Sequence, residues 1–372
     1  MISEPALDPL VAIARQFSPR AAIDRLQPFG NGNINDTFLV ATAAEREGRF
    51  VLQRINTQVF RQPQLVMQNM RTLTDHVRNR LACDPLSPGC RWQVPKVILT
   101  EEGQDHWIDE QGQFWRAIGF IEDSKTFDTI QDLDHAQEMG AALGRFHDLV
   151  SDLPPDRLVD TLEGFHITPS YLQVYDGVLA TRGSLPQSPE ANYCLQFVGD
   201  RRALATVLEN AKAKGKLPLR TMHGDPKVNN VMFDTATRAA ISIIDLDTVK
   251  PGLVHYDIGD CLRSACNLLG EETEQWESVQ FETDLGEAIL RGYLAQSGSF
   301  LTENDYDYLY DAIRLLAFEL GLRFFTDYLA GNVYFKVKHP THNLARALVQ
   351  FKLAESIELQ APTLRTLLQD LR

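Results

Sequence analysis

The sequence lacks the features that mark membrane-spanning and secreted proteins. No stretch of its 372 residues reaches the ~20 consecutive apolar residues of a membrane helix. The N-terminal segment MISEPALDPLVAIARQF carries acids and prolines where a signal peptide has a basic end and an apolar run. We therefore expect a cytoplasmic protein with no membrane partner.

Cysteine is scarce, and its spacing fits neither a disulfide framework nor a metal cluster. The five cysteines are an odd set with no CxxC pair and no Cys/His metal spacing: Cys83, Cys90, Cys194, Cys261 and Cys266. Such a set predicts free thiols in a reducing compartment. The sequence also shows no internal repeat and no low-complexity segment.

Basic residues are outnumbered, with 36 Lys and Arg against 50 Asp and Glu, a net charge of −14 and a pI near 5.1. A protein with a general affinity for nucleic acid needs a basic surface that displaces counterions. We therefore expect no nucleic-acid partner, whereas a nucleotide needs only a local cradle. The sequence does not distinguish a monomer from a homodimer.

The apolar patterns change character along the chain. Residues 34–56 predict a β-hairpin, a helix follows from Pro63, and residues 94–100 and 113–121 predict further strands. Helical periodicity then dominates near residues 134–150, 191–214, 283–296, 303–330 and 341–370, with one β-like island at 231–249. The fold class predicted is α+β, with a β-rich lobe over 1–119, a connector over 120–124 and a mostly helical lobe over 125–372.

The stretch HGDPKVNN, residues 223–230, carries the clearest chemical signal. Asn230 lies five positions after Asp225, and Asp245 follows fifteen residues later at the end of the apolar run ISII. Kinases use this spacing for an Asp that accepts the nucleophile's proton and for an Asn and an Asp that bind Mg²⁺. Alone, Asp225 and Asn230 would be ordinary turn and cap residues; the following β island favours the catalytic interpretation.

A glycine-punctuated turn, FGNGNIND over residues 29–36, lies upstream between two predicted strands. Dinucleotide-binding folds place such glycines at a strand-to-helix junction, which this turn does not occupy. The turn suits a flap whose backbone covers phosphates, although a plain hairpin turn would look the same. Its position ahead of the HGDPKVNN stretch strengthens the phosphate interpretation.

Taken together, these phrases resemble the aminoglycoside phosphotransferase/choline kinase superfamily, which has a two-lobed, protein-kinase-like fold. The phrases GNGNINDTFLV, WRAIGFIED, HGDPKVNNVMFD, IIDLDTVKPG, YDIGDCLRSACN and RFFTDYLAGNVYFKVKH are most similar to the N-acetylhexosamine 1-kinases, over about residues 28–340. The resemblance implies ATP and Mg²⁺ as cofactors and transfer of phosphate to the anomeric hydroxyl of GlcNAc or GalNAc.

The resemblance also assigns roles to single residues. It implies Asp225 as catalytic base, Asn230 and Asp245 as magnesium ligands, and Arg323 and Tyr334 as sugar contacts. The nucleotide contacts that it implies are Gly30, Asn31, Gly32 and Asn33 over the phosphates and Phe120, Ile121 and Glu122 at the adenine. Three residues support the site: His223 by orienting the loop, Asp257 by bracing it from the next helix, and Asp247 as a further ligand or a structural partner.

Two positions depart from the usual kinase pattern. The Lys that follows the glycine hairpin is replaced by Gln53 and Arg54 in FVLQRIN, and the next helix offers no Glu to pair with it. Because side chains alternate along a strand, only one of these two side chains faces the nucleotide. We expect it to be Arg54, since a cation can neutralise the negative charge of the phosphates. Gly224 replaces the Arg of protein kinases, which argues against control by a phosphorylated activation loop.

The acceptor is indicated by the residues near 323–339. Arg323, Lys336 and Lys338 outnumber Asp327 there, whereas a polycationic aminoglycoside would favour an acidic pocket. Choline would favour an aromatic cage without a neighbouring cation. The segment therefore favours a neutral sugar.

Two alternative functions stay open. One is a kinase of the same fold for another sugar, an aminoglycoside or an amino alcohol, and the other is a non-catalytic nucleotide or sugar binder. Lys227 fits either a solvated charge or a contact to the transferred phosphoryl group.

Overall fold

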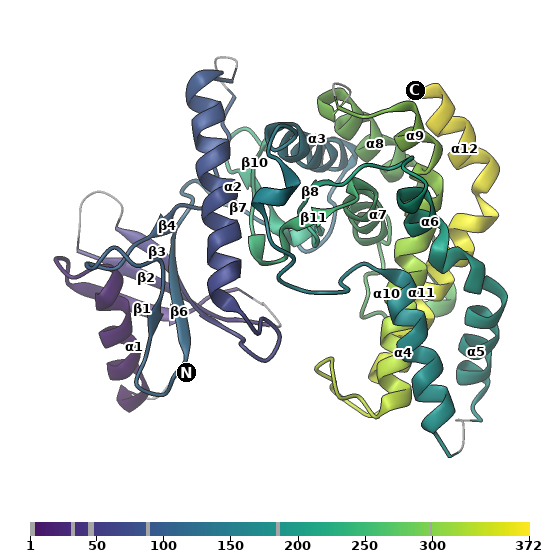
Figure 1. Ribbon diagram of the computed structural model, residues 1–372, viewed down its shortest axis with the longest axis horizontal. Coiled ribbons are helices and arrows are strands. Elements are labelled where there is room, and N and C mark those ends of the chain that lie inside the picture. The colour runs from purple at the N-terminus through teal and green to yellow at the C-terminus, as the bar shows by residue number, and fades with distance from the viewer. Residues whose placement is uncertain (1–3, 31–33, 44–47, 87–89, 184–186, 298–299) are drawn as a thin grey trace. The chain divides into compact units, whose positions relative to one another are not determined.

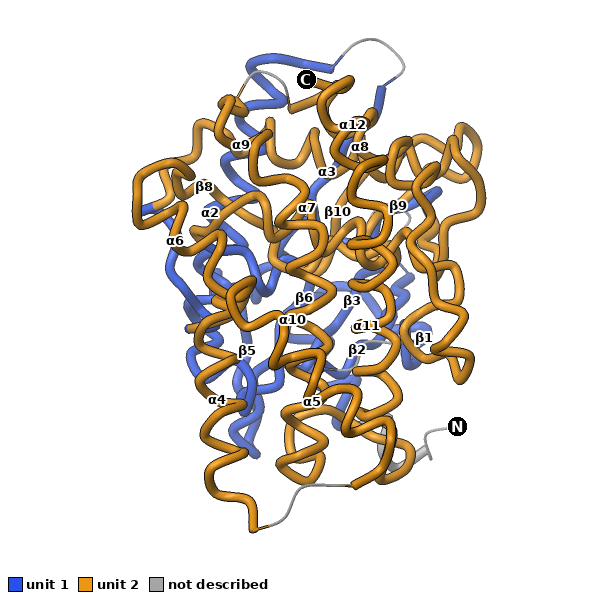
Figure 2. Tube along the Cα trace, turned by 90° about the vertical axis from the view of Figure 1, so that its right-hand side faces the viewer, with its two compact units in different colours: residues 1–124, 156–163, 246–250 blue, residues 125–155, 164–245, 251–372 orange. Residues whose placement is uncertain are grey.

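The computed structural model describes residues 4–30, 34–43, 48–86, 90–183, 187–297 and 300–372. The chain divides into two compact units (Figure 2). The first comprises residues 1–124, 156–163 and 246–250, and the second comprises 125–155, 164–245 and 251–372. Two short segments that come late in the chain thus pack with the first unit. None of the helices in the described part of the chain is long and apolar enough to cross a membrane.

An antiparallel sheet forms the centre of the first unit. Its strand order is β1-β2-β3-β6-β4, and β5 pairs with β6. The strands are β1 (Ile23–Pro28), β2 (Asp36–Thr42), β3 (Arg49–Ile55), β4 (Val97–Ile98), β5 (Trp107–Ile108) and β6 (Phe114–Gly119). The β2–β3 pair confirms the hairpin predicted over residues 34–56.

Two helices, α1 (Glu4–Phe17) and α2 (Pro63–Cys83), lie on either side of this sheet (Figure 1). Ile13 and Phe17 of α1 join a buried cluster with Leu52 and Trp115 of the sheet. Arg116, the neighbour of Trp115, points to the other side, where its guanidinium lies 4.0 Å from the sulfur of Met67 in α2. The alternation of strand side chains thus separates an apolar face under α1 from a partly polar face under α2.

The second unit is mostly helical. Its helices are α3 (Leu133–Leu149), α4 (Thr168–Thr181), α5 (Pro189–Arg201), α6 (Val207–Ala213), α7 (Val254–Ala265), α8 (Thr283–Ser297), α9 (Glu303–Asp307), α10 (Leu309–Ala330), α11 (His342–Leu359) and α12 (Ala361–Asp370). Its short strands include β8 (Arg220–Met222), β9 (Val231–Asp234) and β10 (Ala240–Ile243). The chain passes between the units at β7 (Ser124–Lys125), and β11 (Lys250–Gly252) follows the segment 246–250.

Short 3₁₀ turns complete the chain: η1 (Pro155–Arg157), η2 (Arg202–Thr206), η3 (Val228–Asn230), η4 (Leu246–Thr248) and η5 (Trp276–Ser278). Helix α10 is central to the second unit, where it packs against α4, α7 and α11. Helices α3 and α8 pack so closely that a Cβ on Gly140 would lie 1.9 Å from the backbone oxygen of Ile289. Helix α3 of this pair also packs against β10, the strand that follows the loop and β9.

The structure confirms most of the predicted elements. The helix predicted over 191–214 is divided by the turn η2, and those predicted over 303–330 and 341–370 are also divided: α9 ends before Tyr308, and α12 begins at Ala361, next to Pro362 in its first turn. The strand predicted over 94–100 shrinks to the two residues of β4. Helices α1 and α4 were not predicted; α4 buries only Thr168, Leu172 and Tyr175, so it has little apolar periodicity. All five cysteines are free, as expected.

Candidate active site

The loop between β8 and β9 brings three chemically distinct side chains together in the second unit. The Nζ atom of Lys227 lies 2.6 Å from Oδ2 of Asp225. The Nδ2 atom of Asn230 donates to the backbone oxygen of Asp225 at 2.8 Å and lies 3.3 Å from its Oδ2. The turn η3 produces this arrangement, because it folds the chain back so that the residue five positions on meets Asp225.

A buried carboxylate on α7 holds the backbone of this loop. Asp257 accepts hydrogen bonds from the N–H of His223 at 2.6 Å and from the N–H of Gly224 at 2.8 Å. The Nε2 atom of His147 lies 2.8 Å from the same carboxylate. Burial alone would raise the pKa of Asp257, but the hydrogen bond and charge of His147 hold that pKa below its usual value. Asp257 therefore carries its charge and fixes the start of the loop.

His223 ties the loop to the end of β10. Its Nε2 donates to the backbone oxygen of Ile244 at 2.9 Å, and its Nδ1 accepts from the N–H of Asp225 at 3.2 Å. Burial lowers the pKa of His223, which keeps the imidazole neutral and leaves Nδ1 available as an acceptor. Both ring nitrogens thus contact the backbone, so His223 orients Asp225.

Asp245 follows immediately after this contact, at an exposed turn with the left-handed φ of 64°. Burial acts to lower the pKa of half-buried Lys227, but the charges of Asp225 and Asp245 outweigh it and raise that pKa. Lys227 is therefore a cation placed among carboxylates. Its environment favours a charge-neutralising role over that of a proton donor.

The oxygen atoms near Asp225 suit a hard divalent cation. Asn230 and Asp245 offer an amide and a carboxylate, and Mg²⁺ typically takes one or two such ligands together with substrate phosphates and waters. Among the described residues, no group of three or more His, Cys, Asp or Glu side chains could hold a metal by itself. The donor set fits Mg²⁺ that arrives with a nucleotide better than a resident metal.

In the first unit, a polar row crosses the face of the sheet under α2. Thr37, Gln53 and Arg116 are cross-strand neighbours on β2, β3 and β6. The guanidinium of Arg116 donates to Oε1 of Gln53 at 2.8 Å and lies 2.6 Å from Oδ1 of Asp247. Both charged side chains of this ion pair are almost fully buried, at 1% and 3% exposed. Arg116 thus compensates the charge of Asp247.

Asp247 also anchors the strand that follows the glycine-rich turn. Its Oδ2 accepts from Nδ2 of Asn35 at 2.7 Å, and Oδ1 of Asn35 accepts from the N–H of Asn56 at 3.0 Å. The predicted phosphate contacts Asn31, Gly32 and Asn33 lie outside the described residues, whereas Gly30 has the left-handed φ of 73°. The geometry is that of a structural partner for Asp247, one of its two predicted roles.

Arg54, the cation expected to meet phosphate, lies on the opposite face of β3. Its Nε donates to Oδ2 of Asp36 at 2.9 Å, and its guanidinium lies 5.9 Å from the ring centroid of Trp115. Because alternate residues face opposite sides of a strand, Gln53 points toward Asp247 and Arg54 points away. The geometry therefore favours Gln53 over Arg54 for the face that carries Asp247.

The predicted adenine contacts form a short connector held by side chains. The ring of Phe120 lies 5.9 Å from that of Phe29, at the start of the glycine-rich turn, and 4.5 Å from the guanidinium of Arg49. The carboxylate of Glu122 is paired with the same Arg49. The backbone oxygen of Ile121 accepts from Oγ of Ser124 at 2.6 Å. The connector and the turn are thus fixed to one another within the first unit.

Arg323 of α10 lies among aromatic rings in the second unit. Its guanidinium carbon is 5.0 Å from the ring centroid of Tyr171, 5.3 Å from that of Phe165 and 5.5 Å from that of Phe335. Burial raises the pKa of Tyr171 to about 12, against a smaller opposing effect of Arg323. The phenol is therefore neutral and can donate a hydrogen bond near the cation.

The segment after α10 carries Tyr334, the second predicted sugar contact. Asp327 accepts hydrogen bonds from the N–H groups of Val333, Tyr334 and Phe335 at 2.8–3.0 Å. Asn343 donates a fourth hydrogen bond to the same carboxylate at 2.8 Å. Asp327 is therefore occupied in shaping this segment, which leaves the ring of Tyr334 58% exposed beside Phe335.

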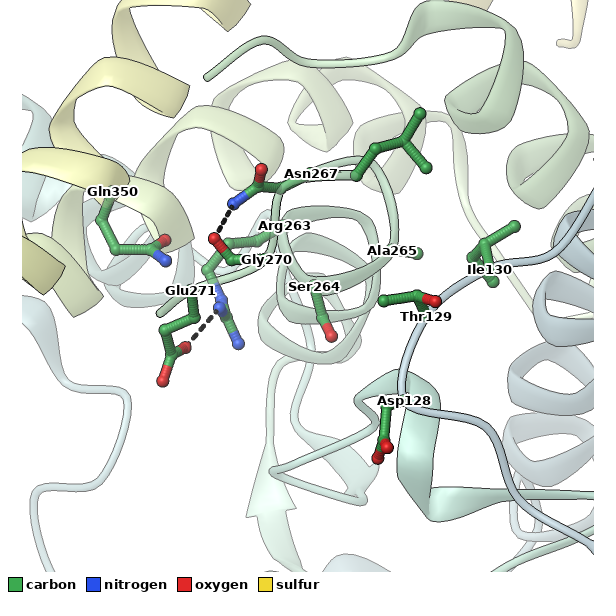
Figure 3. Close-up of a pocket in the computed structure, with 11 residues that line it drawn as sticks. Asp128, Thr129, Ile130, Arg263, Ser264, Ala265, Asn267, Gly270, Glu271 and Gln350 are labelled. Atoms are coloured by element: carbon green, nitrogen blue, oxygen red, sulfur yellow. Dashed lines mark hydrogen bonds and ion pairs between the residues drawn. The ribbon is translucent and has the colours of Figure 1, made fainter. Parts of the chain in front are cut away.

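A cavity of about 110 Å³ lies next to the C-terminal half of α7 (Figure 3). Arg263 lines it and is paired with Asp260 and, as Figure 3 shows, with Glu271. Ser264, another lining residue, accepts a hydrogen bond from the N–H of Val228 in the catalytic loop. The volume is well below the ~300 Å³ of the smallest common ligand pockets, and none of the predicted site residues lines it. It is not a candidate for the acceptor site.

Several residues that contact the predicted site residues match no motif or periodic pattern in the sequence that would mark them as site residues. Arg116 belongs to WRAIGFI, which predicts a buried strand, and only the strand register pairs it with Gln53. Phe165 and Tyr171 precede Arg323 by more than 150 residues and match no motif. Cross-strand pairing and helix packing bring these residues together, so periodicity within one segment does not reveal them.

The comparisons with known proteins agree with this geometry. A model of the phosphotransferase enzyme family matches residues 25–302. Among solved structures, the chain is similar to a microcompartment-associated aminopropanol kinase, with a TM-score of 0.62 and 18% identity over 97% of this chain and 99% of that one.

Two further structures show the same fold. An aminoglycoside phosphotransferase from Alicyclobacillus acidocaldarius has a TM-score of 0.63 and 15% identity over 96% of each chain. A choline kinase from Cryptosporidium parvum has a TM-score of 0.59 and 14% identity over 96% of this chain and 97% of that one. These likenesses confirm the predicted superfamily and its two-lobed α+β, kinase-like fold. Because the family model covers well over half of the sequence, the chain belongs to the phosphotransferase enzyme family.

Proposed function

We propose that this protein transfers the γ-phosphoryl group of ATP to the anomeric hydroxyl of an N-acetylhexosamine. The observation that carries the phosphotransfer is the arrangement of Asp225 with Lys227 at 2.6 Å and with Asn230 at 3.3 Å. A carboxylate, a cation and an amide so placed match the base, the charge-neutralising group and one metal ligand of phosphoryl transfer.

Asp225 accepts the proton in this mechanism. The acceptor hydroxyl gives its proton to Oδ2 of Asp225 as its oxygen forms a bond to the γ-phosphorus, and the bond from that phosphorus to the β-phosphate oxygen breaks. The products are a sugar 1-phosphate and ADP. Lys227 neutralises negative charge beside the reacting groups, and catalysis rests on positioning and on electrostatic stabilisation.

The remaining groups of the mechanism are proposed on the same basis. Asn230 and Asp245 would hold Mg²⁺, which supplies charge stabilisation at the phosphates when it is bound. Gly30, with residues 31–33, would cover the phosphates, and Phe120–Glu122 would contact adenine. We propose that Gln53 and Arg116, rather than Arg54, occupy the place of the usual kinase lysine, because they face Asp247.

The surroundings of Arg323 support a neutral sugar as acceptor. A quaternary or primary ammonium acceptor needs open aromatic faces, but Phe165, Tyr171 and Phe335 already face the guanidinium of Arg323. An aminoglycoside needs available carboxylates, and Asp327 is occupied by backbone N–H groups. Aromatic walls together with the donors of Arg323 and Tyr334 suit hydroxyl and acetamido groups.

An acceptor screen with product identification tests the proposal. ADP release is measured with N-acetylglucosamine, N-acetylgalactosamine, glucose, choline, ethanolamine, aminopropanol and kanamycin, and each product is examined by phosphorus NMR. We expect turnover with an N-acetylhexosamine and a phosphorus signal coupled to the anomeric proton. Turnover confined to an amino alcohol or an aminoglycoside would overturn the sugar assignment. ATP binding without turnover on any acceptor would indicate a binder.

A further inference from the structure

The peptide unit between Gly224 and Asp225 is held at both ends. Its carbonyl oxygen accepts a hydrogen bond from Nε2 of His166 at 2.8 Å. Its N–H donates to Nδ1 of His223 at 3.2 Å, while the N–H of Gly224 itself donates to Asp257. Gly224 has the left-handed φ of 90°, so this peptide plane has an orientation that few other residues allow. The direction of the Asp225 side chain follows from it.

His166 reaches this carbonyl from the chain just before α4. Its other ring nitrogen, Nδ1, lies 2.8 Å from Oε1 of Glu319 on α10. Oε2 of Glu319 accepts from Oγ1 of Thr168 at 2.5 Å. A backbone carbonyl and a carboxylate are both acceptors, so each ring nitrogen of His166 must carry a hydrogen to satisfy both. With Glu319 ionised, as its lowered pKa indicates, these two contacts require an imidazolium.

The groups around His166 favour that charged form. Burial acts to lower its pKa, but the charge and hydrogen bond of Glu319, the charge of Asp260 and the Gly224 carbonyl outweigh it and raise that pKa. The ring stacks on that of Tyr256 from α7, with 5.6 Å between the ring centroids, and the backbone N–H of His166 donates to the hydroxyl of Tyr171 on α4 at 3.4 Å.

The backbone of His166 has the left-handed φ of 62°, an uncommon conformation for a residue with a side chain. Burial acts to raise the pKa of Glu319, but the charge and hydrogen bond of His166 and, less strongly, the charge of Arg323 outweigh it and lower that pKa. Glu319 is therefore ionised beside His166.

We propose that His166 is a positioning residue for the catalytic base: as an imidazolium paired with Glu319, it locks the Gly224–Asp225 peptide and thereby aims the Asp225 carboxylate. The proposal rests on the assignment of Asp225 as base under the proposed function. It is independent of which acceptor is phosphorylated, because none of the contacts involves the acceptor.

This arrangement has a defined pH dependence. Below the raised pKa of His166, both hydrogen bonds are made and the peptide is fixed. As pH rises through that pKa, the ring keeps one hydrogen and can donate to the carbonyl or to Glu319, but not to both. With Glu319 ionised, the stabilisation contributed by the pair is therefore fully present below the ordinary histidine pKa, and it is lost as pH rises through the raised pKa of His166. We expect kcat to fall there.

Two variants distinguish positioning from a purely structural role. In His166→Gln the side chain at this position is neutral at every pH. This variant should lower kcat roughly 10- to 100-fold, as loss of an orienting group does, with little change in the KM for ATP. Its kcat should also lack the fall at alkaline pH that the titration of His166 causes in the wild type. Glu319→Gln removes the charge that keeps His166 protonated, so it should move the alkaline limb to lower pH. His106→Gln is the control, since it removes a histidine–carboxylate pair with Asp105 in the first unit.

Nitrogen NMR of the unliganded wild-type protein tests the proposal even if the variants fold poorly or the acceptor is not a sugar. The His166 resonance, assigned by its loss in His166→Gln or from wild-type sequential data, should show two protonated ring nitrogens at neutral pH. A neutral His166 ring at neutral pH would overturn the proposal. An alkaline limb that is unchanged in Glu319→Gln would also overturn it. Failure of the acceptor screen alone would leave the NMR result standing.

Discussion

Replacing Asp225 by Asn should separate catalysis from stability. Asn has the shape of Asp, and the backbone contacts of this residue, to His223 and Asn230, involve only its N–H and carbonyl oxygen. The substitution removes the ion pair with Lys227, whose two side chains are 28% and 37% exposed. Pairs this exposed contribute about 0–1 kcal/mol, so the free energy of unfolding should change by no more than that.

The effect on turnover should be far larger. A positioned general base contributes about 10²- to 10⁴-fold to the rate, which corresponds to roughly 3–5 kcal/mol of activation free energy at 1.36 kcal/mol per factor of ten. Asn accepts no proton at its amide, so kcat should fall by at least ~100-fold. ATP binding should persist, because the proposed nucleotide contacts are other residues.

The measurement compares ADP release, ATP affinity by calorimetry and urea unfolding for the wild type and the variant. Asp176→Asn is a matched control, because it breaks an ion pair with Arg202 that is likewise partly exposed, in the same unit. Near-wild-type turnover in Asp225→Asn would remove Asp225 as the base. A loss of stability well above that of the control would show that the lost activity reflects a damaged fold.

Two other predictions concern the support of the catalytic loop. Asp257→Asn should lower the free energy of unfolding by about 3 kcal/mol. An amide nitrogen in place of Oδ2 loses the two charge-assisted hydrogen bonds that this oxygen accepts from His223 and His147, worth about 1.5 kcal/mol or more each, while the bond from Gly224 to Oδ1 can persist. A loss below ~1 kcal/mol in urea unfolding would contradict this reasoning. Gly224→Ala should cost about 1–2 kcal/mol for its left-handed backbone and should also lower kcat, whereas Gly215→Ala, with a φ of 70° and open space around it, should cost similar stability and leave kcat unchanged.

Local pattern accounts for the parts of this protein that were predicted correctly. The alternation in residues 34–56 predicts β2 and β3, and the apolar spacing after Pro63 predicts α2. Periodicity suffices for these elements because each has one face buried. It fails for α4, which buries few apolar residues, and it extends three helices through the breaks at η2, Tyr308 and Gln360.

Local sequence pattern does not predict which side chain of β3 faces the nucleotide. Charge alone favours Arg54 as the residue that faces the nucleotide, and alternation alone permits either Gln53 or Arg54. The cross-strand register settles the orientation, because Gln53 is paired with Arg116 and Arg54 with Trp115, which packs in the core under α1. This register also places the buried cation Arg116 beside Gln53 and Asp247, which is why we propose it in the place of the usual kinase lysine.

The sequence by itself determined which side chains meet in the loop 223–230, since Asp225, Lys227 and Asn230 lie close together in the chain and come into contact through local geometry. The resemblance also implied that Asp257 braces this loop. Only the tertiary structure revealed its other support, because His166 lies 58 residues from Gly224 and 153 residues from Glu319 in the chain. Long-range packing of α4, α7 and α10 brings these buried charges to one peptide, and no spacing along the chain encodes that meeting.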